Sequence, residues 1–163
     1  MHADTDTLPP IDGDFVLLRS GPLQLLLPQV DVGAAGHLAR PPRDAGQPGL
    51  FEINAGDDAG DGDQAGFVIA LSPHMTPMPE FPDDRFLLTS FSGHEGVLVC
   101  WDEARVLSRV SLQPRPLPTA MLAAGAPVDA YVEFGEQIAF LCTGERLLAH
   151  AFASLNRSME TAD

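Results

Sequence analysis

One short segment carries three side-chain types that can catalyse acyl transfer when they are gathered in space. Ser92, His94 and Glu95 bring a hydroxyl, an imidazole and a carboxylate close together along the chain. A serine nucleophile needs a base within hydrogen-bond reach and a third group that orients this base, and adjacency in sequence does not supply that geometry. The segment falls at an expected hairpin turn, where such residues are ordinary surface residues. We therefore expect no enzyme activity, no catalytic residue and no cofactor.

A second segment, NAGDDAGDGDQAG at residues 54–66, concentrates aspartate and glycine. Calcium loops place oxygen ligands at alternate positions and close with a glutamate at the twelfth. Asp61-Gly62-Asp63 is followed by Gln64, and no closing glutamate occurs. The aspartates would also repel a phosphate group. The segment is more typical of a solvated hairpin loop, and we expect no metal site, although the pattern leaves open whether the loop holds a cation.

The charge of the chain excludes some classes of partner. Nine basic residues, all arginine, stand against 23 acidic residues and give a net charge of −14. Binding to nucleic acid or to an anionic membrane needs clustered basic residues. We therefore expect protein partners, with no nucleic acid and no membrane insertion.

The cysteines and the apolar runs indicate a cytoplasmic protein. No run of about twenty apolar residues occurs, as a transmembrane helix would need. The acidic residues 1–13 have no features of a secretion signal. Cys100 and Cys142 lie inside apolar runs and are expected to be buried free thiols, as in a reducing compartment. The histidines stand apart, and no zinc-ligand spacing is present.

The elements that must position these residues are mostly short strands. Residues 1–13 are expected to be disordered, and residues 28–48 to form a short helical turn followed by a loop. Apolar runs bounded by glycine and proline predict strands. The expected strands are 15–19, 23–27, 49–53, 67–71, 85–91, 97–101, 105–112, 130–134 and 137–142. Trp101 ends one of these runs and is expected in the core rather than at a binding surface.

A helix is expected at the end of the chain, over residues 145–159. Leu147, Leu148, Ala151, Phe152 and Leu155 recur there at helical spacing, and we expect this stripe to pack on its own domain. Before it, residues 72–84 contain four prolines and predict an extended linker. No long helix separates the strands, which favours two small barrels over a parallel sheet.

Several motifs, taken in order, resemble a CheW-like domain, the coupling protein of bacterial chemosensory systems. Gly96-Val97-Leu98-Val99 is followed by an acidic and apolar segment and then by spaced prolines at 114, 116 and 118. AYVEFGEQIAFLCTGERLL, residues 130–148, is similar to the family's closing segment, and Leu27-Pro28-Gln29-Val30 to an earlier one. The resemblance runs over about residues 14–155 and rests on order and spacing, since each motif alone is weakly specific.

The most recognisable motif of the family, GxxNLRG, is altered here. It aligns with Gly49–Ala55, where Glu52, Asn54 and Ala55 replace the family's asparagine, arginine and closing glycine. Thr143-Gly144 stands where the family usually has Asp-Leu. The loss of a cation beside an expanded acidic loop would alter any contact that depends on charge complementarity. The resemblance is therefore to a divergent member of the family.

The resemblance implies a fold and a division of the chain. The implied fold is mostly β, with two small five-stranded SH3-like barrel lobes and a C-terminal helix. One domain would span 14–157. Its parts would be lobe one at about 14–71, the linker at 72–84, lobe two at about 85–144, and the helix at 145–159.

The resemblance also implies a function. The protein would be a non-catalytic adaptor that couples receptors to a histidine kinase in chemosensory or motility signalling. Its partners would be the kinase regulatory domain and the chemoreceptor tip, or a related signalling protein. The altered motif leaves a second interpretation, an adaptor that has lost kinase coupling and binds a different signalling or pilus-motility partner. The positions that match the family's binding surfaces are Leu50, Phe51, Ile53, Asn54, Phe67 and Ile69 on the first lobe, with Val32 and Ala35 toward the groove between lobes.

Overall fold

The computed structural model describes residues 8–38, 42–53, 66–72, 75–82, 87–117, 128, 130–134 and 136–162. Asn54 and most of the acidic segment, residues 54–65, lie outside this part, so the loop and cation predictions stay untested. The described chain is mostly strand with one long helix at its end. The first elements are β1 (Ile11–Ser20), β2 (Leu23–Pro28), the 3-10 turn η2 (Gln29–Asp31), β3 (Val32–His37), β4 (Arg43–Gln47), β5 (Leu50–Ile53) and β6 (Gly66–Ala70). The others are β7 (Leu87–Phe91), β8 (His94–Trp101), β9 (Glu103–Leu112), β10 (Arg115–Pro116), β11 (Ala130–Phe134), β12 (Gln137–Leu141) and α2 (Gly144–Ala162).

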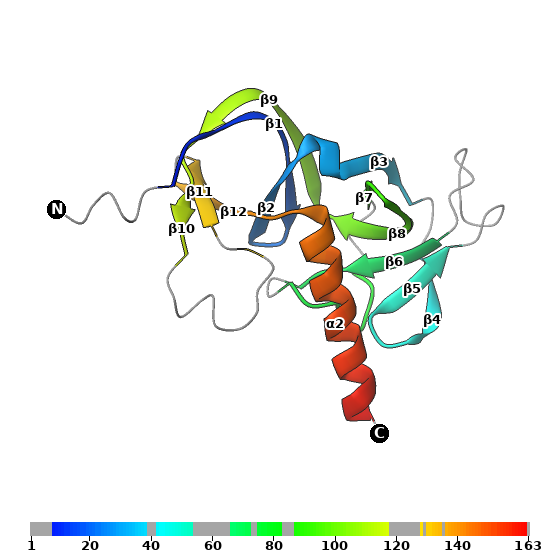
Figure 1. Cartoon of the computed structure of the whole chain (residues 1–163). Helices are drawn as coiled ribbons and strands as arrows, with labels where there is room; N and C mark the ends of the chain where they lie inside the picture. The colour runs from blue at the N-terminus through cyan, green and yellow to red at the C-terminus, as the bar shows by residue number, and fades with distance from the viewer. Residues whose placement is uncertain are drawn as a thin grey trace.

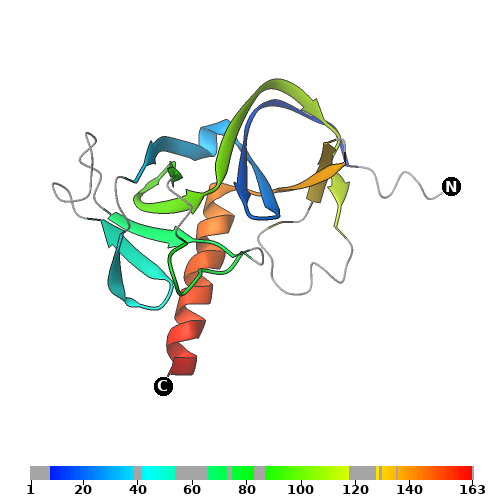
Figure 2. The same ribbon diagram turned by 180° about the vertical axis from the view of Figure 1, so that it is seen from behind.

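The strands form two sheets that lie side by side, with α2 running along their junction (Figure 1, Figure 2). The first sheet has the order β10-β11-β12-β2-β1-β9, and the second has the order β3-β7-β8-β6-β5-β4. Each sheet contains six strands, and among the described residues neither closes into a ring. The prediction of a mostly β chain with a C-terminal helix is confirmed, whereas the closed five-stranded barrels are not what the pairing shows.

The sheets do not follow the two consecutive lobes predicted from the sequence. The first sheet joins β1 and β2 to β9–β12, so it contains both ends of the strand series, and the second sheet contains the middle, β3–β8. Two neighbouring pairs, β12 with β2 and β6 with β8, are parallel. The other pairs are antiparallel, so neither sheet is a parallel sheet, as expected. The two strands of each parallel pair are connected through other strands instead of through a helix.

Alternate residues of the central strands face two different cores. In β6, Ile69 belongs to a central cluster between the sheets and α2, and Val68 and Ala70 belong to a cluster on the outer face of the second sheet. In β1, Val16 and Leu18 face the central cluster. Because both faces of these strands are covered, their sequences are continuous apolar runs without a polar partner at every second position.

Two connecting segments differ from their predictions. Residues 32–37 and 43–47, expected to be loop, form the outer strands β3 and β4. The linker predicted as extended turns back on the sheet, because Met78 N–H donates to the Ala70 carbonyl at 2.8 Å and Leu71 bridges Pro77. Residues 11–13, expected to be disordered, begin β1.

Helix α2 begins where several groups meet its first turn. Thr143 Oγ1 accepts a hydrogen bond from the Arg146 N–H at 3.2 Å, which is the usual role of a threonine that caps a helix. Asp31 Oδ2 accepts one from the Gly144 N–H at 3.1 Å. A Cβ at Gly144 would lie 3.1 Å from the ring of buried Phe91, so glycine lets the helix approach the second sheet. The buried positions Leu147, Leu148, Ala151 and Leu155 confirm that the apolar stripe packs on its own domain.

A buried serine forms a hydrogen bond between the two sheets. Ser20, at the end of β1, donates its hydroxyl to the carbonyl of Leu71, after β6, at 2.6 Å. We expect Ser20→Ala to lower the free energy of unfolding by about 1 kcal/mol, the typical net contribution of one buried hydrogen bond. Urea unfolding followed by circular dichroism would measure the change. Ser111→Ala, on the exposed side of β9, is the matched control and should leave stability nearly unchanged; an equal loss in both variants would contradict the assigned role of Ser20.

Candidate protein-binding groove

The structure places three of the six predicted contact residues of the first lobe in the core. Phe51 and Ile53 are buried in the outer cluster of the second sheet, and Ile69 is fully buried in the central cluster. Leu50 is half-buried against the central cluster. The buried side chains are not available to a partner. The prediction of a contact surface is therefore wrong for Phe51, Ile53 and Ile69.

Phe67 is the exception on this strand pair. Its side chain is 44% exposed, and it pairs across β5 and β6 with Glu52. It lies on the opposite side of β6 from Val68, which is fully buried. Phe67 therefore gives the second sheet an exposed aromatic side chain beside a carboxylate.

The two residues expected at the groove do line one. Val32 and Ala35, on β3, lie along a groove of about 650 Å³ that we call the edge groove. Its other wall is β9, with Ala104 and Val106. The remaining lining residues are Val16, Gln29, Gly33, His37, Leu87, Thr89, Asp102 and Glu103.

Both walls of the edge groove are outer strands. β3 is the last strand at one side of the second sheet, and β9 is the last at one side of the first. An outer strand offers backbone N–H and C=O groups to a further chain. The groove therefore combines backbone groups from two sheets with an apolar lining, an arrangement that suits a protein segment.

Val106 is the most exposed large apolar side chain of this groove, at 54%. The acidic end of the groove is held in place by neighbours. Asp102 Oδ2 accepts a hydrogen bond from the Gly21 N–H at 2.6 Å, and Arg19 Nε lies 3.1 Å from Glu103 Oε1. The Arg19–Glu103 pair is largely exposed and adds little stability, so its main effect is to set the charge pattern at the groove.

Ser92 and His94 are not brought into a catalytic arrangement within the described residues. Ser92 Oγ donates to the Val30 carbonyl at 2.6 Å, and its N–H donates to the Asp31 carbonyl at 2.8 Å. His94 begins β8 and is exposed. The two hydrogen bonds of Ser92 therefore connect the β7–β8 turn to η2.

The described part of the chain shows no sign of a metal site or of a membrane-spanning helix. No group of three or more His, Cys, Asp and Glu side chains gathers there in a way that could hold a metal ion. None of the helices there combines the length and the apolar character needed to cross a bilayer. Cys100 and Cys142 are both buried, as predicted, and are thiols that form no disulfide.

Comparison with known proteins adds no assignment: no protein-family model matches the chain, and neither does any curated protein. The resemblance to CheW-like domains therefore stays a prediction that rests on the motifs quoted above.

Val106 was not singled out as a contact residue from the sequence. The signal that could have found it is local: it is an apolar residue next to Arg105, in a strand whose polar and apolar residues alternate irregularly. The sequence does not show that β9 is an outer strand. Among the described strands β9 pairs only with β1, which lies near the start of the chain.

Proposed function

We propose that the protein is a non-catalytic adaptor that joins signalling proteins in the cytoplasm, within a bacterial chemosensory or motility system. The observation that carries this proposal is the edge groove. There the outer strands β3 and β9 each have one side open to pairing, around Val32, Ala35 and Val106. Edge strands beside apolar pockets are a recurring means of peptide recognition. The resemblance of the motifs to CheW-like domains supplies the signalling context, with two open sheets in place of closed barrels.

An adaptor needs two separate surfaces to hold two partners at once. β3 is an outer strand of the second sheet, and β7, β8 and β6 follow it in that order. The exposed Phe67 is on β6, three strands away from β3. The groove and Phe67 therefore lie apart on the same rigid sheet. In this proposal the groove takes the receptor tip. Phe67 with Glu52 meets the kinase regulatory domain or, in the second interpretation, the partner that replaces it.

The altered charge near Phe67 favours a partner surface different from that of a typical CheW-like protein. Glu52, which stands at the family's asparagine position, pairs directly with Phe67. A carboxylate beside an exposed ring would attract a basic partner surface and repel an acidic one. This observation supports the second interpretation, an adaptor whose kinase-side partner has changed while its groove is retained.

The experiment places a charge in the groove without disturbing the core. We expect Val106→Arg to weaken binding of a purified receptor tip by about tenfold, because a desolvated apolar contact is replaced by a long charged side chain. Titration calorimetry at low and at moderate salt would measure the affinity. Ile138→Arg, at a similarly exposed position on β12, is the matched control and should bind like the parent protein.

The same titration with a kinase regulatory domain separates the two interpretations. Binding of both proteins supports chemosensory coupling, and binding of the receptor tip alone supports an adaptor with another partner on its kinase side. Absence of binding to both proteins, or equal losses in Val106→Arg and Ile138→Arg, would overturn the proposal.

A further inference from the structure

The first sheet has a gap beside the beginning of β1. On one side β1 pairs with β9 from Ile11 onward. On its other side the pairing with β2 starts only at Phe15, opposite Pro28. Among the described residues, no strand pairs with residues 11–14 on that second side. We call this stretch and the opening beside it the β1 slot.

The gap exists because the chain turns away after β2. Pro28 has no N–H and ends the strand, and η2 follows at once. The Val30 and Asp31 carbonyls accept hydrogen bonds from Ser92, and the Asp31 carboxylate accepts one from the Gly144 N–H. These three bonds hold η2 toward the second sheet and α2, so it does not continue along β1.

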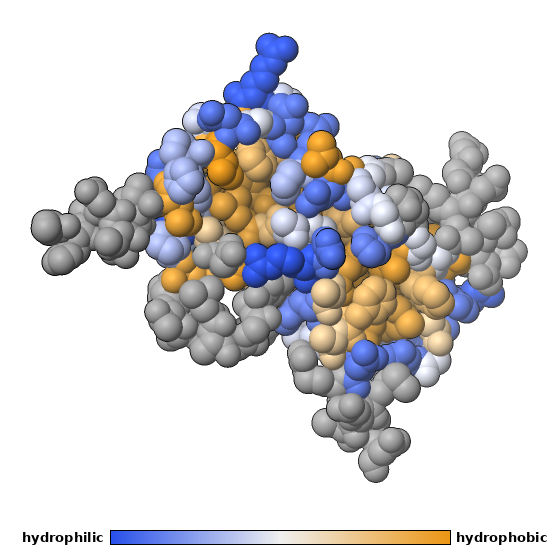
Figure 3. Space-filling view, in the orientation of Figure 1, coloured by the Kyte–Doolittle hydropathy of each residue, from blue (hydrophilic) through white to orange (hydrophobic). Residues whose placement is uncertain are grey.

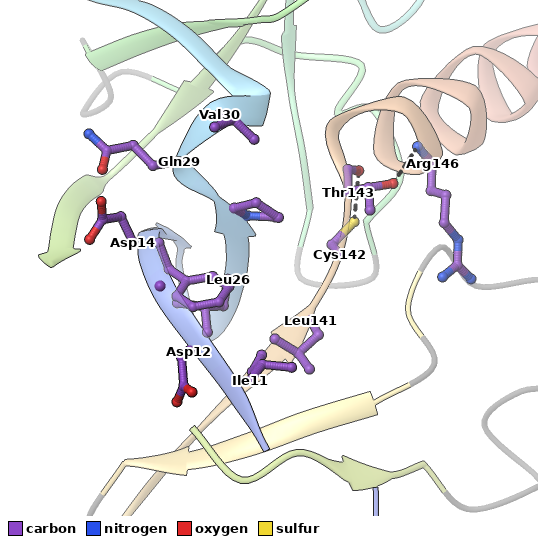
Figure 4. A pocket seen from close by; sticks show the side chains of 13 residues that line it. Ile11, Asp12, Asp14, Leu26, Gln29, Val30, Leu141, Cys142, Thr143 and Arg146 are labelled. Carbon is purple, nitrogen blue, oxygen red and sulfur yellow. Dashed lines mark hydrogen bonds between the residues drawn. The ribbon is translucent and has the colours of Figure 1, made fainter. Parts of the chain in front are cut away.

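The β1 slot opens into a cavity of about 780 Å³. Its floor is apolar: Phe15 and Leu26 are buried members of one core cluster, and Ile11 and Leu141 pack against it. Figure 4 shows Asp12 and Asp14 along β1, on one side of the cavity, and Cys142, Thr143 and Arg146 on the other side. A cavity of this size can accept one or more apolar side chains of a bound segment.

The β1 wall is held in shape by a bulge. The register between β1 and β9 shifts between Gly13 and Phe15, and Gly13 has a φ of 144°, which favours glycine. Arg109, whose φ is also positive, donates its N–H to Asp14 Oδ1 at 2.7 Å. Bulges of this kind redirect side chains at sheet borders. The wall is therefore preformed and needs little ordering before a strand is added.

The charge at the β1 slot indicates what it binds. Asp12 and Asp14 are both exposed, and within the described residues neither carboxylate has an ion-pair partner. The whole chain carries a net charge of −14, which attracts basic partners over a longer range. At the rim, Val30 is 80% exposed and extends the apolar surface outward.

We propose that the β1 slot binds an extended segment of a partner protein in which basic and apolar residues alternate. The segment adds a strand beside residues 11–14, places its basic side chains near Asp12 and Asp14, and inserts apolar side chains toward Phe15 and Leu26. Strand addition of this kind obtains affinity from the backbone and specificity from alternate side chains. This site adjoins the edge groove, since Gln29 lines both, but it is built on β1 instead of β3 and β9. The proposal does not rest on the adaptor function.

The test uses the full chain and a synthetic peptide of about eight residues, a typical strand length, in which lysine and valine alternate. Two further peptides are compared with it: one with glutamate in place of lysine, and one N-methylated on alternate residues so that it cannot pair through its backbone. Calorimetry at about 0.15 M salt limits unspecific attraction, because the Debye length there is about 8 Å. Amide hydrogen exchange locates the binding site.

We expect the lysine peptide to bind and to slow exchange at residues 11–14, and both comparison peptides to bind at least about tenfold more weakly. Asp12→Lys should weaken binding of the lysine peptide by about tenfold, whereas Asp44→Lys, an equal charge change at an exposed position of β4, should have little effect. Binding that survives N-methylation, or that responds equally to both variants, would show unspecific attraction and overturn the proposal.

Three other results would also overturn it. They are protection confined to residues outside the β1 slot, self-association of the chain that already protects residues 11–14 without peptide, and binding of a small apolar molecule in the cavity with no binding of the peptide. Because Val106 lies on β9 in the edge groove, Val106→Arg should leave peptide binding unchanged. Failure at the slot is thereby distinguished from failure of the adaptor proposal.

Discussion

Trp101→Ala is expected to lower the free energy of unfolding by about 4 kcal/mol, a large part of the stability of a domain of this size. The indole is fully buried in the central cluster, between the two sheets and α2. Its Nε1 donates to Thr89 Oγ1 at 2.9 Å, so the truncation removes a hydrogen bond as well as the largest side chain of that core. Urea unfolding followed by circular dichroism would measure the loss, since Trp101 is the single tryptophan and its fluorescence disappears in the variant.

Two milder variants keep this prediction measurable even where Trp101→Ala folds too poorly to purify. Trp101→Phe retains most of the apolar volume and should lose much less stability than the alanine variant. Thr89→Val removes only the hydrogen-bond acceptor and should cost about 1 kcal/mol. A loss below about 1 kcal/mol for Trp101→Ala would mean that the ring is at a surface, as an anchor for a partner would be.

The strands were predictable wherever the sequence has a continuous apolar run. β5, β6, β11 and β12 begin and end within a residue of the predicted limits, and the helix predicted at 145–159 is observed at Gly144–Ala162. Neighbouring predicted strands also pair as hairpins in β1–β2, β5–β6, β7–β8 and β11–β12. These elements depend on local signals, namely apolar runs, turn residues and helical spacing.

β3 and β4 could not be found in this way. Their sequences, VGAAGH and RDAGQ, are poor in the β-branched and aromatic residues that favour strands. They become strands because β7 and β5 each offer them a free side for pairing. The composition of the two sheets was missed for a related reason, since pairs such as β1–β9 join residues far apart in sequence and leave no local trace.

The candidate site shows the same limit at the level of single residues. Phe51, Ile69 and Phe67 are all apolar residues of two neighbouring strands, yet only Phe67 is substantially exposed. Alternation along β6 does not identify it, because residues 68, 69 and 70 are all buried by clusters on both faces of the sheet. Whether an apolar strand residue is core or contact depends on which faces other elements cover, and the sequence does not specify that directly.

Leu147→Ala should lower the free energy of unfolding by about 3 kcal/mol, within the range for a buried leucine truncated to alanine. Leu147 is fully buried in the first turns of α2 and belongs to the same central cluster as Trp101. α2 lies along the junction of the two sheets, so a cavity at this position weakens the contact of the helix with both sheets. Urea unfolding with circular dichroism measures the change directly.

Phe152→Ala is the matched control on the same helix. Phe152 occurs at helical spacing with Leu148 and Leu155 but is 38% exposed, and apolar surface gathers over α2 and the neighbouring strands on this face (Figure 3). Because the ring is only partly removed from water, its truncation should destabilise the protein much less than Leu147→Ala. Equal losses would mean that the outer face of α2 is packed as tightly as its inner face. A larger loss at Leu147 shows that the central core, and not helix propensity alone, holds α2 in place, because alanine is the better helix former.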